Sequence, residues 1–213
     1  MQISLQQVVP TFLEGEKISV SQVWDSSIVF NTAEKIEIIA PSGSGKTSLI
    51  HFLYGLRKDY TGDISYDEKN IETFDAEDFA RYRQQHTSIV FQDLRLFPEQ
   101  TVLQNLTVKR QLDPFHAESK ISAMTKRLGI ESKLNKLCKT CSYGEQQRIA
   151  IIRSLQQPFD FLFLDEPFSH LDDNNQQLAM ELVEEECSLR NASVILADLR
   201  PVEHFKADKT LNL

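Results

Sequence analysis

Apolar positions along the chain follow two different periods. Residues 3–9 and 23–30 carry β-branched side chains that partly alternate with polar ones, which predicts half-exposed antiparallel strands. Four other short runs are apolar almost throughout, as in parallel strands that helices cover on both faces. These runs are residues 36–40, 88–91, 161–164 and 194–197.

Helical spacing of apolar residues marks much of the remaining chain. It follows the run at 36–40 as far as Gly55, and it covers residues 174–190 before the last apolar run. Between residues 97 and 141 the spacing is helical only. The pattern therefore predicts an α/β fold with a mixed sheet, an antiparallel β part at the N-terminus, and a small helical insertion.

Length, composition and charge limit the class of protein. The 213 residues suffice for one domain, or for a core with one insertion, and 41% hydrophobic and 25% charged residues are ordinary for a globular chain. The net charge of -8 argues against wrapping nucleic acid, because clustered Lys and Arg drive phosphate-backbone binding. No apolar run approaches the roughly 20 residues of a membrane helix, and the N-terminus lacks an export pattern, so we expect a cytoplasmic protein.

The three cysteines do not suggest a disulfide framework or a metal site. Cys138 and Cys141 have C-x-x-C spacing, but no further pair of ligands with suitable spacing lies nearby. Together with Cys187, they are predicted to be free thiols, the first two on or near a helix.

The stretch APSGSGKTS at residues 40–48 carries the most specific chemistry. It matches the phosphate-binding pattern G-x-x-x-x-G-K-[ST] except at its first position, where Ala40 replaces glycine. Glycines let backbone N–H groups surround phosphates, Lys46 supplies a counter-charge, and Thr47 places a hydroxyl on Mg²⁺. We expect a P-loop NTPase core of the RecA-like kind, with nucleotide bound by Ser42, Gly43, Ser44, Gly45, Lys46, Thr47 and Ser48.

The alanine at position 40 should not prevent binding. Ala costs almost nothing if its φ is negative, and about 1 to 2 kcal/mol if its φ is positive. Several amides and a lysine that hold a Mg-nucleotide can absorb that strain.

The stretch FLFLDEP at residues 161–167 supplies two carboxylates after a buried strand. Asp165 would reach the carboxyl edge of the sheet, where it can hold Mg²⁺ through water. Glu166 points differently and can polarise an attacking water. A strand that merely ends in two acids is common, but an upstream phosphate loop makes that reading the weaker one.

A third element, CSYGEQQR at residues 141–148, precedes a predicted helix. Together with the phosphate loop, Gln92 after a strand, LDEP and SHLD, it gives the chain the order of motifs found in ATP-binding cassette (ABC) transporter ATP-binding subunits. The chain resembles that family over essentially all 213 residues, and within it the group of FtsE, LolD and MacB. The resemblance implies one cassette domain over 1–213, with a nucleotide-binding core at 1–92 and 143–213 and a helical subdomain at 93–142.

The resemblance also implies roles for individual residues in a sandwich of two copies around two ATP molecules. Ser142, Gly144 and Glu145 would meet the γ-phosphate held by the other copy, and Asp172 would lie at the interface. Gln92 would sense the γ-phosphate and Mg²⁺. Phe12 is the candidate to stack on adenine, and a core position is an equal alternative for it.

Besides Ala40, four positions depart from the family pattern: Cys141 replaces the usual leucine of the signature, Glu145 stands for its commoner glutamine, and Tyr143 and Asp198 are the other two. Tyr143 stands where the signature usually has glycine, so its side chain either loosens the closed dimer or packs on the partner. Asp198 is placed by our alignment where the family has a histidine that contacts the γ-phosphate. A carboxylate about 5 Å from that phosphate would be opposed by roughly 3 kcal/mol at a dielectric near 20. Turnover would fall by about two orders of magnitude, unless Asp198 turns away or Arg200 neutralises it.

The sequence therefore predicts an ATPase with weak or partner-dependent turnover. The resemblance implies that it acts with ATP and Mg²⁺ as a homodimer on an integral membrane permease or an FtsX-like protein, at the inner face of the membrane. One alternative is a switch that uses ATP occupancy and hardly turns over. Another is a soluble cassette that acts on nucleic acid or ribosomes, which the acidic charge disfavours.

Overall fold

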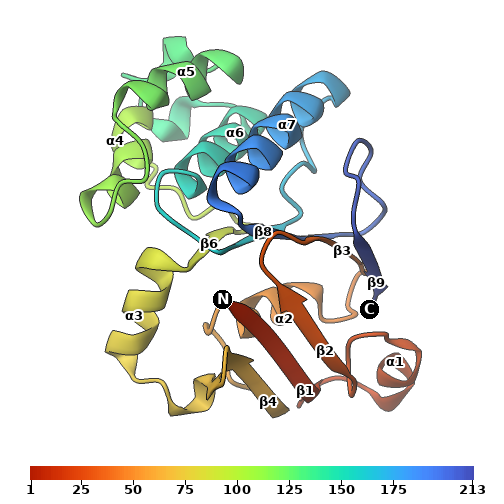
Figure 1. Ribbon diagram of the computed structural model, residues 1–213. Helices are drawn as coiled ribbons and strands as arrows, with labels where there is room; N and C mark the ends of the chain where they lie inside the picture. Colours follow the sequence, from red (N-terminus) through yellow and green to blue (C-terminus); the bar gives the residue numbers. More distant parts are fainter.

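The computed structural model describes residues 1–213, and their strands form two sheets (Figure 1). One sheet is antiparallel in the order β2-β1-β4-β5, and the other is parallel in the order β6-β7-β8-β3-β9. The structure has the predicted antiparallel part at the N-terminus, but the strands expected in one mixed sheet are divided between an antiparallel and a parallel sheet. The strands are β1 Gln2–Pro10, β2 Ser27–Asn31, β3 Lys35–Ile39, β4 Tyr60–Tyr66, β5 Lys69–Asn70, β6 Thr87–Val90, β7 Phe161–Asp165, β8 Ser193–Asp198 and β9 Lys209–Asn212.

Helices cover both faces of the parallel sheet. Figure 1 shows α2 between the two sheets and α4 to α7 on the opposite side of the parallel sheet. The α-helices are α1 Gly15–Val20, α2 Lys46–Leu53, α3 Ala76–Gln85, α4 Val102–Thr107, α5 Ser119–Arg127, α6 Tyr143–Ser154 and α7 Asp173–Arg190. The 3-10 turns are η1 Ile71–Thr73, η2 Val108–Gln111, η3 Glu131–Lys133 and η4 Cys138–Thr140.

Strand β7 shows why its apolar run is continuous. Phe161 and Phe163 face the core that contains α2, whereas Leu162 and Leu164 face the core that contains α6 and α7. Because successive side chains of a strand point to opposite faces, a strand between two apolar layers needs an apolar residue at every position. This packing places Asp165, the last residue of β7, at the carboxyl edge of the sheet.

The end of α2 agrees with the predicted stop at Gly55. This glycine has φ +67°, and a Cβ on it would lie 2.2 Å from Cε1 of Phe79. Both the left-handed backbone and the contact with the Phe79 ring require glycine here.

The predicted strand at 23–30 begins four residues too early. Only Ser27–Asn31 forms β2, and residues 23–26 turn toward the phosphate loop. The Trp24 indole is buried there and donates to the Ser44 carbonyl oxygen at 3.1 Å. The apolar residues before β2 are therefore buried in a turn rather than in a strand.

The prediction of a continuous helix over residues 132–139 is wrong. This segment contains only short 3-10 turns, because two of its carbonyl oxygens accept from the start of α4 instead of from N–H groups one helical turn further along the segment. The N–H groups of Val102 and Leu103 donate to the carbonyls of Lys136 and Leu134, each at 2.9 Å. Apolar spacing alone does not distinguish these two arrangements.

Five elements have no counterpart in the sequence prediction. They are α1, α3, β4, β5 and β9. Strand β5 has two residues, and β9 has a single apolar residue among its four, so neither carries an apolar run or period that could be recognised. Helix α3 buries only Phe79 among its residues, although Asp75 caps its N-terminus with bonds to Glu77 N and Asp78 N.

The helices between β6 and β7 share one apolar core with α7. Val102 of α4, Ile121 of α5 and Ile149 of α6 belong to the same cluster as Leu162 of β7. The boundaries of the helical subdomain at 93–142 stay a prediction, because this core continues across them. All three cysteines are free, as predicted, and the structure also buries them. None of the helices combines the length and the apolar composition that a membrane span requires.

Candidate active site

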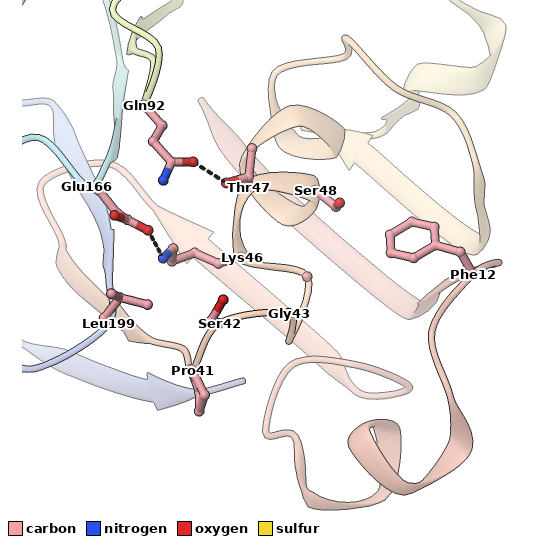
Figure 2. Close-up of a pocket in the computed structure, with 11 residues that line it drawn as sticks. Phe12, Pro41, Ser42, Gly43, Lys46, Thr47, Ser48, Gln92, Glu166 and Leu199 are labelled. Carbon is pink, nitrogen blue, oxygen red and sulfur yellow. Dashed lines mark hydrogen bonds and ion pairs between the residues drawn. The ribbon is translucent and has the colours of Figure 1, made fainter.

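The carboxyl ends of β3, β7 and β8 meet at one edge of the parallel sheet and form a cavity of about 460 Å³ (Figure 2). These three strands are neighbours in the sheet, so the loops that follow them converge. The cavity is lined by Phe12, Pro41, Ser42, Gly43, Gly45, Lys46, Thr47, Ser48, Gln92, Glu166 and Leu199. Most of the predicted site residues are thereby brought together.

The phosphate loop has the backbone that its glycines allow. Gly43 and Gly45 have φ values of +76° and +96°, and α2 begins at Lys46. A Cβ on Gly45 would lie 3.0 Å from Cζ2 of Trp24. Trp24 therefore supports the loop from behind, a role that no sequence pattern indicates.

Ala40 fits its position without strain. It is fully buried and is not among the residues with positive φ. Its N–H donates to the carbonyl of Asp198 at 2.9 Å, which ties the loop to the end of β8. Alanine in place of glycine therefore costs little here, as expected for negative φ.

Lys46 and Glu166 form an ion pair at the base of the cavity, as Figure 2 shows. The Lys46 ammonium lies at the start of α2, where the helix adds unpaired N–H groups and partial positive charge. Glu166 has φ +47°, an unusual backbone conformation for glutamate, and its N–H donates to Ala197 O at 2.9 Å. The Glu166 carboxylate thus pairs with Lys46, whereas the adjacent Asp165 carboxylate does not.

Asp165 is buried, and neither of its carboxylate oxygens has a hydrogen-bond partner. Burial raises the pKa of this carboxyl group to about 6, while the nearby Thr47 hydroxyl and the Lys46 ammonium act in the opposite direction. Thr47 and Gln92 lie beside it, and the three line a second cavity of about 260 Å³. The Thr47 hydroxyl donates to Gln92 Oε1 at 3.3 Å.

These three oxygen-bearing side chains fit Mg²⁺. An orphaned buried carboxylate, a hydroxyl and an amide oxygen are the donor types that the ion prefers. No cluster of three or more His, Cys, Asp or Glu side chains could form a metal cage by itself. The set is therefore suited to a cation that also takes oxygens from a phosphate.

The alignment placed Asp198 next to the γ-phosphate, but in the structure Leu199, the next residue, lines the cavity that contains Lys46. Asp198 ends β8, and its Oδ1 accepts the Leu199 N–H at 2.7 Å. Burial raises the pKa of the Asp198 carboxyl group, and this residue lines a neighbouring cavity. Sequence reasoning missed Leu199, since a one-residue shift in the alignment decides which side chain faces the cavity.

Phe12 is not a core residue. The residue is 51% exposed, and its ring lies at the rim of the cavity. The Arg57 guanidinium lies 5.0 Å from the ring centroid and also donates to Ser48 Oγ at 2.8 Å. The ring is thereby held beside the phosphate helix with much of its surface open.

The predicted signature residues lie outside this cavity. Ser142 caps α6 by accepting from Glu145 N, and the Glu145 carboxylate accepts from Ser142 N at 2.8 Å. Lys133 pairs with Glu145 at 2.9 Å and lowers its pKa. Asp172 caps α7 by accepting from Asn175 N at 2.8 Å. None of Ser142, Gly144, Glu145 and Asp172 lines the cavity of their own chain.

A comparison with known protein families assigns this arrangement of phosphate loop, carboxylates and capped helix to one family. The family model described as ABC transporter matches residues 23–169. The chain belongs to this family. Its phosphate loop, Gln92 and LDEP segment all lie within the matched range of the ABC model.

Curated relatives and solved structures agree with this assignment. The lipoprotein-releasing system ATP-binding protein LolD of Syntrophotalea carbinolica is 31% identical over 185 residues, which are 85% of this chain and 81% of that protein. LolD of Buchnera aphidicola is 33% identical over 76% of this chain and 73% of its own. The dimeric structure of MJ0796, a bacterial ABC transporter cassette, superposes with a TM-score of 0.77 at 22% identity, over 93% of this chain and 88% of that one. This last likeness confirms the ABC cassette fold.

Proposed function

We propose that this chain is an ABC subunit that binds and hydrolyses ATP between two copies of itself and thereby drives a separate membrane protein. The single observation that carries the proposal is the convergence of Lys46, Glu166 and the unpartnered Asp165 beside the phosphate loop. The curated relatives are named as the ATP-binding proteins of lipoprotein-releasing systems, which supports a transport or mechanotransmission role. The subunit would be cytoplasmic and peripheral, held at the inner face of the membrane by a permease or an FtsX-like partner.

Within one copy, the phosphate loop would hold the triphosphate. Gly43, Gly45 and the start of α2 offer backbone N–H groups, and Lys46 offers a positive charge to the β- and γ-phosphate oxygens. Thr47 and Gln92 would ligate Mg²⁺ directly, and Asp165 would hold it through water. The bound ion would neutralise phosphate charge.

Glu166 would act on the attacking water once it no longer pairs with Lys46. The phosphate competes with the Glu166 carboxylate for the same ammonium, so binding would release the carboxylate. A free carboxylate next to the γ-phosphate can orient and polarise a water molecule.

The second copy would complete the site. Ser142 is exposed at the N-terminus of α6, where unpaired N–H groups favour an anion. Ser142, Gly144 and Glu145 of one copy would face the γ-phosphate held by the other, with Asp172 at the interface. Their position outside the cavity of their own chain supports a role across an interface.

The oligomeric state in ATP tests this proposal. Glu166→Gln should block hydrolysis and trap a dimer at saturating Mg-ATP, measured by light scattering after size exclusion. Glu166→Gln combined with Lys46→Ala is the matched control and should remain monomeric. A monomeric Glu166→Gln protein that nevertheless binds Mg-ATP would contradict the sandwich.

A switch that depends on ATP occupancy with little turnover is the second candidate. Leu199 favours it, because an apolar side chain lines the cavity near Lys46 and offers no hydrogen bond to a γ-phosphate. Slow phosphate release that persists with the membrane partner present would support the switch.

Capture from detergent-solubilised membranes distinguishes the kinds of partner. The bait is Glu166→Gln with Mg-ATP, and the control bait carries Lys46→Ala. An integral membrane protein retained only by the ATP-competent bait would support the proposal. Salt-sensitive retention of ribosomes or DNA would favour a soluble cassette instead.

A further inference from the structure

The Tyr143 side chain connects two parts of the molecule that sequence places far apart. It occupies the first position of α6, directly after Ser142, and is 43% exposed. Its hydroxyl donates to the carbonyl oxygen of Gln92 at 3.1 Å. Its ring packs on the imidazole of His170, with centroids 4.3 Å apart and planes tilted by 58°.

Gln92 is thereby engaged at both of its ends. Its side-chain oxygen accepts the Thr47 hydroxyl at 3.3 Å, and Figure 2 shows this side chain directed toward the phosphate helix. Its backbone oxygen accepts the Tyr143 hydroxyl. If Mg-ATP fixes the position of Gln92, the effect would therefore pass directly to Tyr143, which bonds the Gln92 backbone.

His170 holds the other side of the tyrosine ring. The His170 N–H donates to Gln147 Oε1 at 3.1 Å, and Gln147 Nε2 donates to Ser169 Oγ at 3.0 Å. A Cβ on Gly144 would lie 2.9 Å from the His170 carbonyl oxygen, so only glycine allows this approach of α6. The start of α6 is thus fastened to the segment that follows Glu166, and only the tyrosine side chain extends this connection to Gln92.

We propose that Tyr143 is a positioning residue that couples the two nucleotide sites of the dimer. Tyr143 links Gln92 to Ser142. Gln92 lies in the nucleotide site of its own chain, beside Lys46, whereas Ser142 would contact the nucleotide bound by the partner. Occupancy of one site then fixes the Ser142 tip in the conformation that engages the other. This inference rests on the proposed function, because it requires Ser142 to act across the dimer.

Coupling between the two nucleotide sites can be measured separately from binding at either site. A residue that transmits occupancy changes the ATP dependence of dimerisation without changing binding to an isolated site. Glycine at position 143, as the family pattern usually has, offers no such side-chain connection. The tyrosine therefore adds coupling to this chain and does not form part of the phosphate pocket.

The experiment compares two substitutions in the Glu166→Gln background. Tyr143→Phe keeps the ring on His170 and removes the bond to Gln92. Tyr82→Phe is the control, because the Tyr82 ring packs on Phe74 while its hydroxyl makes no hydrogen bond. Affinity for Mg-ADP is measured from the fluorescence of Trp24, the single tryptophan, whose indole bonds the phosphate loop. Sedimentation velocity gives the ATP concentration at which half of the protein is dimeric.

Tyr143→Phe should raise that ATP concentration about fivefold, as for the loss of one hydrogen bond, and should leave the affinity for Mg-ADP unchanged. Tyr82→Phe should change neither quantity. Dimerisation of Tyr143→Phe at the same or a lower ATP concentration would overturn the coupling role, as would an equal loss of Mg-ADP affinity. If the Glu166→Gln parent never dimerises, the proposed function itself fails, and this outcome is distinct from the other two.

Discussion

Lys46 and Glu166 pair with each other across the floor of the phosphate cavity, with side-chain exposures of only 7% and 13%. The pair joins the first residue of α2 to the residue that follows β7. A nucleotide phosphate must therefore displace a carboxylate from the lysine before Glu166 can act on water. The same contact stabilises the empty site and opposes its occupation.

Glu166→Gln should increase the affinity for Mg-ADP about tenfold, because the phosphate no longer competes with a carboxylate for Lys46. The nucleotide-free variant should also melt at a lower temperature, since a buried ammonium loses its partner. Trp24 fluorescence and thermal melting measure the two effects. Glu184→Gln, which breaks the more exposed pair with Lys35, is the control. Unchanged affinity in Glu166→Gln would contradict competition for the lysine.

Leu199→His should speed phosphate release by about tenfold or more, because it places a hydrogen-bond donor in the cavity near the γ-phosphate. Asp198→His is the matched control and should have a smaller effect, since Asp198 lines the neighbouring cavity. Both are measured by steady-state phosphate release at saturating Mg-ATP. A larger gain from Asp198→His would support the alignment in which Asp198 faces the phosphate.

Asp165→Asn should stabilise the nucleotide-free protein at neutral pH. Burial raises the pKa of Asp165 from 3.8 to about 6. Between these two pH values the folded protein holds a proton that the unfolded chain has released. The resulting penalty is absent below pH 3.8, grows up to about pH 6 and is complete above it. We expect a gain of about 3 kcal/mol at pH 7 and little at pH 4.

Urea unfolding of both proteins across this pH range measures the gain. The charges that also act on Asp165 are those of Lys46, Glu166 and Asp198, which the substitution leaves in place. Asp160→Asn, at a half-buried pair with His86, is the control for removal of a carboxylate. A gain that does not depend on pH would show that Asp165 is not penalised by ionisation.

Phe12→Ala should weaken binding of ADP about tenfold and leave inorganic pyrophosphate unaffected, because stacking on a base involves only the ring. Phe12→Tyr keeps the ring and should bind like wild type. Competition titrations followed by Trp24 fluorescence compare the three proteins. An equal loss of affinity for ADP and pyrophosphate would contradict stacking on the base. It would indicate that the substitution disturbs Arg57 and Ser48, which hold the ring beside the phosphate helix.

Local patterns predicted the parts of the site that depend on neighbouring residues in the chain. The glycines of the phosphate loop, Lys46 at the start of α2 and Asp165 at the end of β7 follow from strand, turn and helix chemistry within a few residues. The stop of α2 at Gly55 belongs to the same class. Segments whose backbone bonds elsewhere, such as residues 132–139, were predicted wrongly, because their partners lie about 35 residues away.

The sequence by itself determined the family, the phosphate loop and the carboxylates, because these are short motifs with a fixed chemical role at fixed spacing. Only the tertiary structure decided that Glu166 pairs with Lys46, that Leu199 lines the cavity near them, and that Tyr143 reaches Gln92. Each of these contacts joins residues 51 or more positions apart. Which side chains meet over such distances depends on how the strands order themselves in the sheet, and that order results from packing the whole core.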